Sequence, residues 1–158
     1  MYNEISIIDR VRLMKLTLYT DYSLRVLIYL GAKEEGELSN IQEIADAYQI
    51  SKNHLMKVTH ELGKLGLIET IRGRKGGIRL AKKPEEINVG KVVRKTEDHF
   101  ELVECFQPGG GNCVISPVCG LKHALAKALQ AYLKVLDEYT LADLVHNPLE
   151  LRSLFQND

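Results

Sequence analysis

Apolar residues recur at helical spacing along the first third of the chain, with short polar breaks between the repeats. This spacing predicts a first helix over residues 20–31, with Thr20 or Asp21 as its N-cap. A charged loop, KEEGE, follows it. A second, short amphipathic helix is expected over residues 41–48, with Ser39 or Asn40 as the capping residue.

A third helix is expected after a break at Gln49 and Ile50, with Ser51 as its N-cap. Its buried side is formed by apolar residues three or four positions apart, namely Leu55, Val58, Leu62 and Leu65. Basic and amide side chains occupy its other sides. Two helices only a few residues apart, the second with exposed basic and amide groups, predict a helix-turn-helix.

Two short β-prone runs, LIETI and GIRLA, follow the third helix and flank a glycine-rich basic turn, RGRKGG. A helix-turn-helix followed by a basic hairpin is typical of a winged helix, in which the second helix enters the major groove of DNA. We expect Asn53 and His54 to contact base edges. Phosphate or minor-groove contacts are expected from Ser51, Lys52, Lys57, Arg72, Arg74 and Lys75. The alternative is a winged-helix protein-interaction module with an incidental basic tip.

Beyond Pro84 the pattern predicts one further helix in INVGKVVRKTE, a loop in ECFQPGGGNCVISPVCGLKH and a long helix over 121–138. The long helix has a broad apolar face, which is either core or a dimer seam. A two-fold regulator that reads a palindromic DNA site requires the seam. Short helices are expected from Thr140 and from Pro148.

The predicted fold is therefore mainly α with a small β-hairpin. It divides into four parts, which are an N-terminal extension (1–13), a winged helix-turn-helix DNA-binding domain (14–83), a linking helix with a cysteine-rich cluster loop (84–120), and a long dimerisation helix with C-terminal helices (121–158).

Composition agrees with a globular protein, because 45% of the 158 residues are hydrophobic and the net charge is zero. The charge is nevertheless segregated: residues 51–83 contain nine Lys or Arg and two Glu, a net charge of +7. No apolar run approaches the roughly 20 residues needed to span a bilayer, and the N-terminus lacks a secretory signal, so we expect a cytoplasmic protein with no membrane partner. Neither a nucleotide-binding glycine motif nor a Ser/His/Asp set is present, which argues against an enzyme or electron carrier.

Three cysteines lie close together with the spacing C-x7-C-x5-C, in a loop rich in glycine and proline. No CxxC pair is present, so neither a zinc ribbon nor a thioredoxin-type site is supported. Thiolates in such a loop favour an iron-sulfur cluster. Zinc and unligated or redox-active thiols are the alternatives. A cluster needs a fourth ligand, for which the candidates are His123, Glu104, Asp98, His99 or a residue of the other subunit.

The segments MKLTLYTDYSLRVLIYL, ISKNHLMKV, ETIRGRKGGIRL, INVGKVVR and CVISPVCGLKH resemble the iron-sulfur winged-helix regulators, the family of the NsrR and IscR groups. The resemblance is closest to the Bacillus-type NsrR group and covers nearly all of residues 14–158. It implies a homodimeric repressor that loses DNA affinity when nitric oxide attacks its cluster, and so derepresses nitrosative-stress or nitrate-respiration genes. The alternative is a regulator that senses iron-sulfur cluster supply or redox state.

The same resemblance implies that Cys105, Cys113 and Cys119 bind a 4Fe-4S cluster, with Asp21 of the opposite subunit as fourth ligand. Asp21 is otherwise an ordinary helix N-cap. An IscR-like 2Fe-2S site would use a histidine, but His123 lies one position later than that pattern requires.

The chain departs from the family pattern at three places. The first cysteine gap is longer than in many relatives. Lys75 replaces a more usual glycine in the wing, where a positive φ would cause strain. Residues 1–13 have no counterpart, and Met14 is a possible native start.

Overall fold

The structure, a computed structural model, describes residues 15–156, so the predicted N-terminal extension lies outside the described residues. Its α-helices are α2 (Leu18–Gly31), α3 (Ile41–Tyr48), α4 (Lys52–Lys64), α5 (Val89–Thr96), α6 (Gly120–Asp137), α7 (Leu141–Leu144) and α8 (Pro148–Phe155). Its strands are β1 (Ile68–Ile71) and β2 (Gly77–Leu80), and its short 3-10 helices are η2 (Pro84–Glu86), η3 (Glu104–Phe106) and η4 (Ser116–Val118). The predicted fold class, mainly α with one small hairpin, is confirmed.

Helix α2 begins earlier than the pattern predicted. Its N-cap is Thr17, whose hydroxyl oxygen accepts a hydrogen bond from the backbone N–H of Thr20 at 3.3 Å. The expected caps, Thr20 and Asp21, both lie inside the first turn, so neither assignment is right. Thr20 does not cap because its own hydroxyl is fully buried and donates to the carboxylate of Glu97 at 2.7 Å.

The helix-turn-helix forms as the sequence predicts. Asn40 caps α3 in a capping box with Glu43, whose backbone N–H donates to Asn40 Oδ1 at 2.9 Å. The helix ends at Gln49, which has the left-handed φ of 53° that starts the turn. Ser51 occupies the N-cap position of α4, but its side chain makes no capping hydrogen bond.

The core surrounds α2, and the wing packs against it through β2. The two strands pair antiparallel, with Glu69 opposite Arg79. Ser39 forms an isolated antiparallel β-bridge beside β2, because its backbone exchanges two hydrogen bonds with Ile78 at 2.8 and 2.9 Å. Gly77 permits this approach, since a Cβ there would lie 2.7 Å from the carbonyl oxygen of Ser39. Buried side chains from α2, α3, α4 and the hairpin meet in this core, among them Val26, Leu27, Ile44, Leu55, Leu62 and Ile78.

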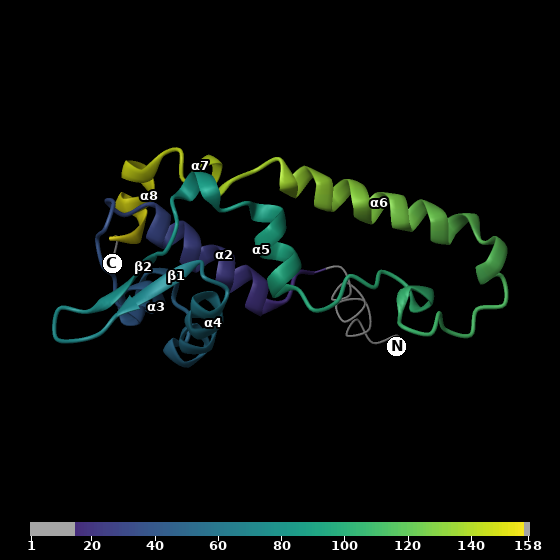
Figure 1. Ribbon diagram of the computed structural model, residues 1–158, viewed down its shortest axis with the longest axis horizontal. Coiled ribbons are helices and arrows are strands. Elements are labelled where there is room, and N and C mark those ends of the chain that lie inside the picture. Colours follow the sequence, from purple (N-terminus) through teal and green to yellow (C-terminus); the bar gives the residue numbers. More distant parts are fainter. Residues whose placement is uncertain (1–14, 157–158) are drawn as a thin grey trace, which may run out of the picture.

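Helix α6 projects from this body as an arm, and the segment between α5 and α6 lies alongside its far part (Figure 1). Its near end is fixed to α5 by an Arg94–Asp137 ion pair and by Asn88 Nδ2, which donates to the Asp137 carbonyl at 2.7 Å. No residue of α6 is buried in the described chain, so this chain alone does not use its apolar face as core. No helix in the described region is long and apolar enough to cross a membrane.

Candidate DNA-binding surface and cysteine loop

Helix α4 has one buried and one exposed side, as the pattern predicted. Leu55, Val58 and Leu62 are buried, whereas Leu65, just beyond the helix, is half-buried. The five residues that the sequence assigned to DNA contacts on this helix and its cap are all exposed, namely Ser51, Lys52, Asn53, His54 and Lys57.

Within this exposed side, His54 lies next to Tyr22 of α2. Its ring centroid lies 6.2 Å from that of Tyr22 in α2, so His54 occupies the flank of α4 next to α2. The outward stripe is formed by residues at helical spacing, Asn53, Met56, Lys57 and His60, all exposed. Sequence reasoning overlooked Met56, although its position three residues after Asn53 and four before His60 is the signal that identifies it.

The wing presents Arg72, Arg74 and Lys75 to solvent in the turn between β1 and β2. Gly73 takes the positive φ of this turn, 113°, and the N–H of Gly76 donates to its carbonyl at 3.0 Å. Lys75 does not have a positive φ, so the strain considered for this position does not arise.

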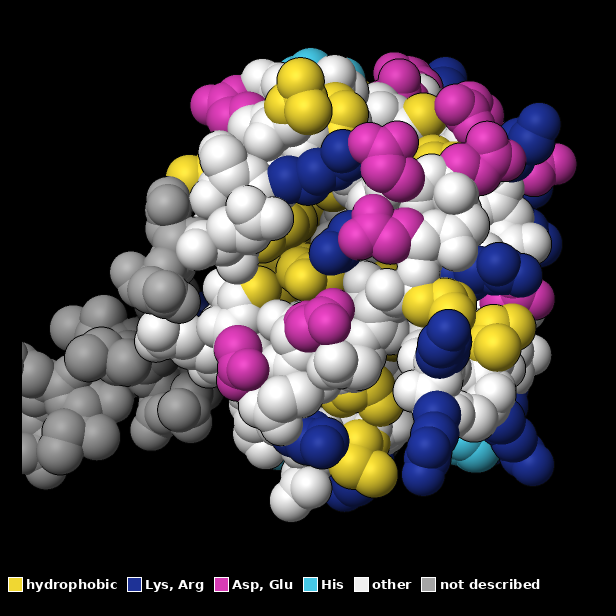
Figure 2. Space-filling view, turned by 90° about the vertical axis from the view of Figure 1, so that its left-hand side faces the viewer, with side chains coloured by type: hydrophobic (Ala, Val, Ile, Leu, Met, Phe, Trp, Pro, Cys, Tyr) yellow, Lys and Arg dark blue, Asp and Glu magenta, His cyan; other side chains and the backbone are white. Residues whose placement is uncertain are grey.

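The cations assigned to DNA contacts have no acidic partner among the described residues. Lys64 and Arg79 are paired, with Glu61 at 2.8 Å and with Glu69 at 2.6 Å. Among the described residues, no ion pair is formed by the five cations assigned to DNA contacts, which are Lys52, Lys57, Arg72, Arg74 and Lys75. These cations can therefore contact phosphates without first breaking an ion pair. Figure 2 views the end of the molecule at the left of Figure 1, and its lower end presents Lys, Arg and His side chains, whereas acidic ones lie higher.

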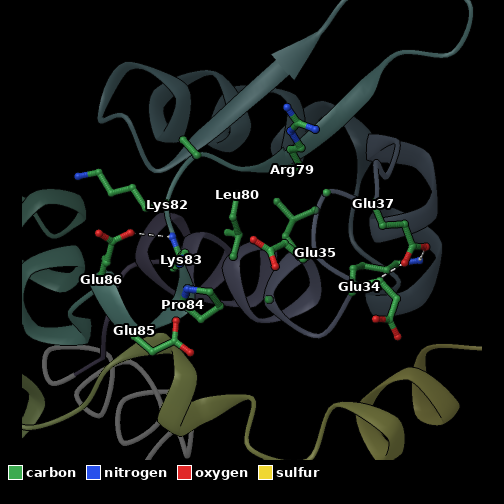
Figure 3. Close-up of a pocket in the computed structure, with 15 residues that line it drawn as sticks. Glu34, Glu35, Glu37, Arg79, Leu80, Lys82, Lys83, Pro84, Glu85 and Glu86 are labelled. Carbon is green, nitrogen blue, oxygen red and sulfur yellow. Dashed lines mark hydrogen bonds and ion pairs between the residues drawn. The ribbon is translucent and has the colours of Figure 1, made fainter.

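A pocket of about 650 Å³ separates the KEEGE loop from the end of β2 and η2 (Figure 3). Glu34, Glu35 and Glu37 line one side, and Lys82 and Lys83 line another. It contains none of the residues predicted to bind DNA or a cluster, so the candidate sites lie elsewhere.

The cysteine loop follows α5 and contains only the short 3-10 helices η3 and η4 among its described elements. All three cysteines are free thiols, with Cys113 exposed and Cys105 and Cys119 half-buried. The three consecutive glycines, 109–111, all have positive φ, which explains why regular structure stops there. Cys119 is the N-cap of α6, and its Sγ accepts the backbone N–H of Lys122 at 3.3 Å.

The single chain does not bring the predicted ligands together. No three His, Cys, Asp or Glu side chains among the described residues are placed to hold a metal ion. Figure 1 explains this for Asp21, because α2 lies in the body and the cysteine loop lies along the arm. The donor chemistry nevertheless fits an iron-sulfur cluster, since the loop offers three cysteines that form no disulfide, none of them fully buried.

The candidate fourth ligands differ in their surroundings. The Asp21 carboxylate is held by Arg25, with Nε to Oδ1 at 3.1 Å and Nη2 to Oδ2 at 3.0 Å, and keeps 39% of its side chain exposed. His99 pairs with Glu101 at 3.2 Å. Asp98, Glu104 and His123 are exposed.

Glu97 is a residue that sequence reasoning missed. It is only 8% exposed, and its Oε2 accepts hydrogen bonds from Thr17 N, Thr17 Oγ1 and Thr20 Oγ1 at 2.9, 3.2 and 2.7 Å. It therefore connects the end of α5, where the chain enters the cysteine loop, to the N-terminus of α2. Its spacing of four residues from Val93 placed it on the apolar side of α5, which was the available signal.

Residues 16–147 match the Rrf2 family, described as "Iron-dependent Transcriptional regulator". This chain belongs to the Rrf2 family. The HTH-type transcriptional regulator NsrR of Bacillus subtilis (strain 168) is 66% identical over 143 residues, covering 90% of this chain and 98% of that protein. NsrR of Bacillus licheniformis is 65% identical over 141 residues, covering 89% and 99%.

Solved structures agree with this assignment. CymR, the global cysteine regulator of Bacillus subtilis, superposes with a TM-score of 0.68 at 27% identity, over 84% of this chain and 97% of that one. IscR of T. potens shares the fold, with a TM-score of 0.67 at 23% identity over 85% of this chain and 88% of its own. The resemblance to the NsrR group is thus confirmed, and the Rrf2 relatives are named transcriptional regulators rather than enzymes.

Proposed function

We propose that this Rrf2 protein is a cytoplasmic, homodimeric DNA-binding repressor that senses nitric oxide through a cysteine-ligated iron-sulfur cluster. Loss of DNA binding on exposure to nitric oxide would derepress nitrosative-stress or nitrate-respiration genes. The similarity to NsrR proteins over nearly their whole length carries this proposal. The three free thiols on one loop and the exposed cations of α4 and the wing support it.

Dimerisation through α6 is supported by the apolar surface that this helix exposes. Leu121, Tyr132 and Val135 are 65%, 44% and 52% exposed. A continuous apolar face on an 18-residue helix is costly in water, and a second copy of the same helix covers it. A two-fold dimer presents two α4 helices, which matches a palindromic operator in double-stranded DNA.

In this proposal Cys105, Cys113 and Cys119 of one subunit and Asp21 of the partner subunit hold the cluster, most simply as 4Fe-4S. A carboxylate has enough lone pairs for Asp21 to accept the two Arg25 hydrogen bonds and still bind iron. A 2Fe-2S cluster with His123 as fourth ligand is the alternative arrangement. When bound, the cluster supplies iron that reacts with nitric oxide, so the link between the subunits would depend on the absence of nitric oxide.

The chain's own residues connect that link to DNA. Asp21 precedes Tyr22, whose ring packs beside His54 at the N-terminal end of α4. Glu97 holds the N-terminus of α2 against the end of α5 through three hydrogen bonds. Tying Asp21 to the partner's loop therefore restrains α2, and α2 restrains the flank of α4, so the two recognition helices keep the spacing that a palindrome requires.

The test is to purify the full chain without oxygen and to follow its visible spectrum, its iron and sulfide content and its DNA binding during titration with nitric oxide. A thiolate-to-iron band that bleaches in parallel with operator release is the expected result. Cys113→Ser removes a proposed ligand and is expected to abolish the band. Arg74→Ala removes only a proposed DNA contact and should keep the band while weakening DNA binding.

The fourth ligand is identified by a matched pair of variants. Asp21→Ala is expected to destabilise the cluster, whereas Asp98→Ala, an exposed carboxylate beside the same loop, should leave it intact. The reverse result, or cluster loss only in His123→Ala, would refute the assignment of Asp21. A colourless, iron-free protein that binds DNA with full affinity would refute the cluster proposal as a whole.

A second function is favoured by the family description, which names iron rather than nitric oxide. In this case the protein reports iron-sulfur cluster supply or redox state. Operator binding that responds to iron starvation but stays constant as nitric oxide bleaches the cluster would favour this second function over the first.

A further inference from the structure

Met56 stands out on the proposed DNA-reading face, because it is a large apolar side chain in the middle of a polar stripe. It is 50% exposed, and its neighbours on the outward side of α4 are Asn53, Lys57 and His60. The buried side of α4 is already formed by Leu55, Val58 and Leu62, and Met56 is not among the buried core residues. The thioether side chain of Met56 is therefore available to contact another molecule.

The same face also leaves room for close approach. Gly63 lies seven residues, or two helical turns, after Met56, and apart from its chain neighbours and the adjacent backbone of α4 no atom of the described chain lies within 4 Å of the Cβ that another residue would have there. Glycine inside a helix lowers stability by roughly 0.5–1 kcal/mol relative to alanine. Nothing within the described chain requires glycine at this position, which is consistent with a bulky partner lying along this face.

The chemistry of the DNA major groove includes one apolar group that suits Met56. Among the four bases, only thymine presents a methyl group in that groove, and apolar side chains discriminate thymine through it. Asn53 is three residues away on the same face and has the amide group that pairs with adenine. The outward stripe thus has groups for both the apolar and the polar features of A·T pairs.

Resting on the proposed function, we infer that Met56 is a specificity-determining residue that contacts the methyl group of one thymine in each operator half-site. Burying one methyl group corresponds to roughly a fourfold change in affinity. Two symmetric half-sites would give roughly fifteenfold, because the two contributions multiply.

The test removes the proposed methyl contact either from the DNA, by replacing thymine with deoxyuridine, or from the protein, by Met56→Ala. The full wild-type chain, purified without oxygen, first selects its preferred site from duplexes with a random central segment. Each thymine pair of that site is then replaced by deoxyuridine, which lacks only the 5-methyl group. We expect one symmetric pair of replacements to weaken wild-type binding by roughly fifteenfold and to leave binding of Met56→Ala unchanged.

Two further variants make the result specific. Met56→Leu keeps an apolar side chain and should retain the sensitivity to the thymine methyl. Leu154→Ala removes an apolar side chain that is 60% exposed on α8, and should behave as wild type. Because Met56 and Leu154 are both exposed, we expect every variant to fold, which thermal unfolding will verify.

The failure of this inference is distinguishable from failure of the proposed function. If wild type selects a site but no deoxyuridine replacement weakens it, or if Met56→Ala stays as sensitive as wild type, the inference is overturned and the regulator remains. If no sequence is selected at all, the proposed DNA-binding function is overturned, and this inference with it.

Discussion

The clearest quantitative prediction concerns Glu97, the buried carboxylate that joins α5 to the start of α2. Glu97→Ala removes the acceptor of three hydrogen bonds. Thr17 is exposed, so water replaces its two bonds, but Thr20 is fully buried and its hydroxyl loses the 2.7 Å bond to the carboxylate and keeps only the 3.2 Å contact with Thr17 Oγ1. A hydrogen bond to a charged group contributes about 1.5–3 kcal/mol, so we expect the free energy of unfolding to fall by about 2 kcal/mol.

Chemical denaturation of Glu97→Ala, Thr20→Val and the double variant measures this contribution. Because the two side chains contact each other at 2.7 Å, the two effects should not add, and the coupling free energy is expected to be about 1–2 kcal/mol. The midpoint of thermal unfolding should fall by about 4–8 °C in Glu97→Ala. Glu97→Gln keeps an oxygen acceptor and should lose less. Additive effects, or a loss below about 0.5 kcal/mol in Glu97→Ala, would show that this carboxylate does not hold α2.

Other predictions address the wing, α4 and the joint of the arm. Gly76→Ala places a Cβ 2.1 Å from the Ile71 carbonyl oxygen, so it should distort the wing turn and weaken DNA binding more than tenfold in gel shifts, with α-helical circular dichroism unchanged. Gly63→Ala meets no atom and should raise the free energy of unfolding by about 0.5–1 kcal/mol; a loss would contradict the open surface there. Arg74→Ala should reduce the slope of log K against log salt by about 0.9 for each lost phosphate contact, and an unchanged slope would exclude a phosphate role. The hydrogen bond from Arg94 lowers the pKa of Asp137, so its contribution to stability is present above the usual Asp pKa and lost as pH falls through the lowered value. Denaturation midpoints of wild type and Asp137→Asn should therefore converge at acid pH, and a constant difference would contradict this linkage.

Much of the fold could be predicted because local patterns and local interactions agree. The helices of the helix-turn-helix are fixed by apolar spacing together with caps such as Asn40, and both signals lie within a few residues of each other. The wing is fixed by two β-prone runs around a glycine-rich turn. The exposure of the cations on α4 followed in the same way, because the outward side of a helix is set by the residues that it buries.

One wrong assignment and one unforeseen contact arose where a residue distant in sequence decided the outcome. Thr20 was expected to cap α2, but the carboxylate of Glu97, 77 positions away in sequence, takes its hydroxyl and leaves the cap to Thr17. His54 was expected to contact base edges, which stays a prediction; the structure adds that its ring lies 6.2 Å from that of Tyr22, on the flank of α4 next to α2. Neither contact has a local signal, because both join separate helices.

The sequence by itself determined which segments are helical, where the wing lies and which loop contains the thiols, because these properties depend on short-range periodicity and residue chemistry. Only the tertiary structure decided which exposed residues form the outermost stripe of α4, that Glu97 connects the end of α5 to α2, and that α6 keeps its apolar face exposed in the single chain. Those properties depend on contacts between elements far apart in sequence, and a linear pattern specifies that a face is apolar without specifying what will cover it.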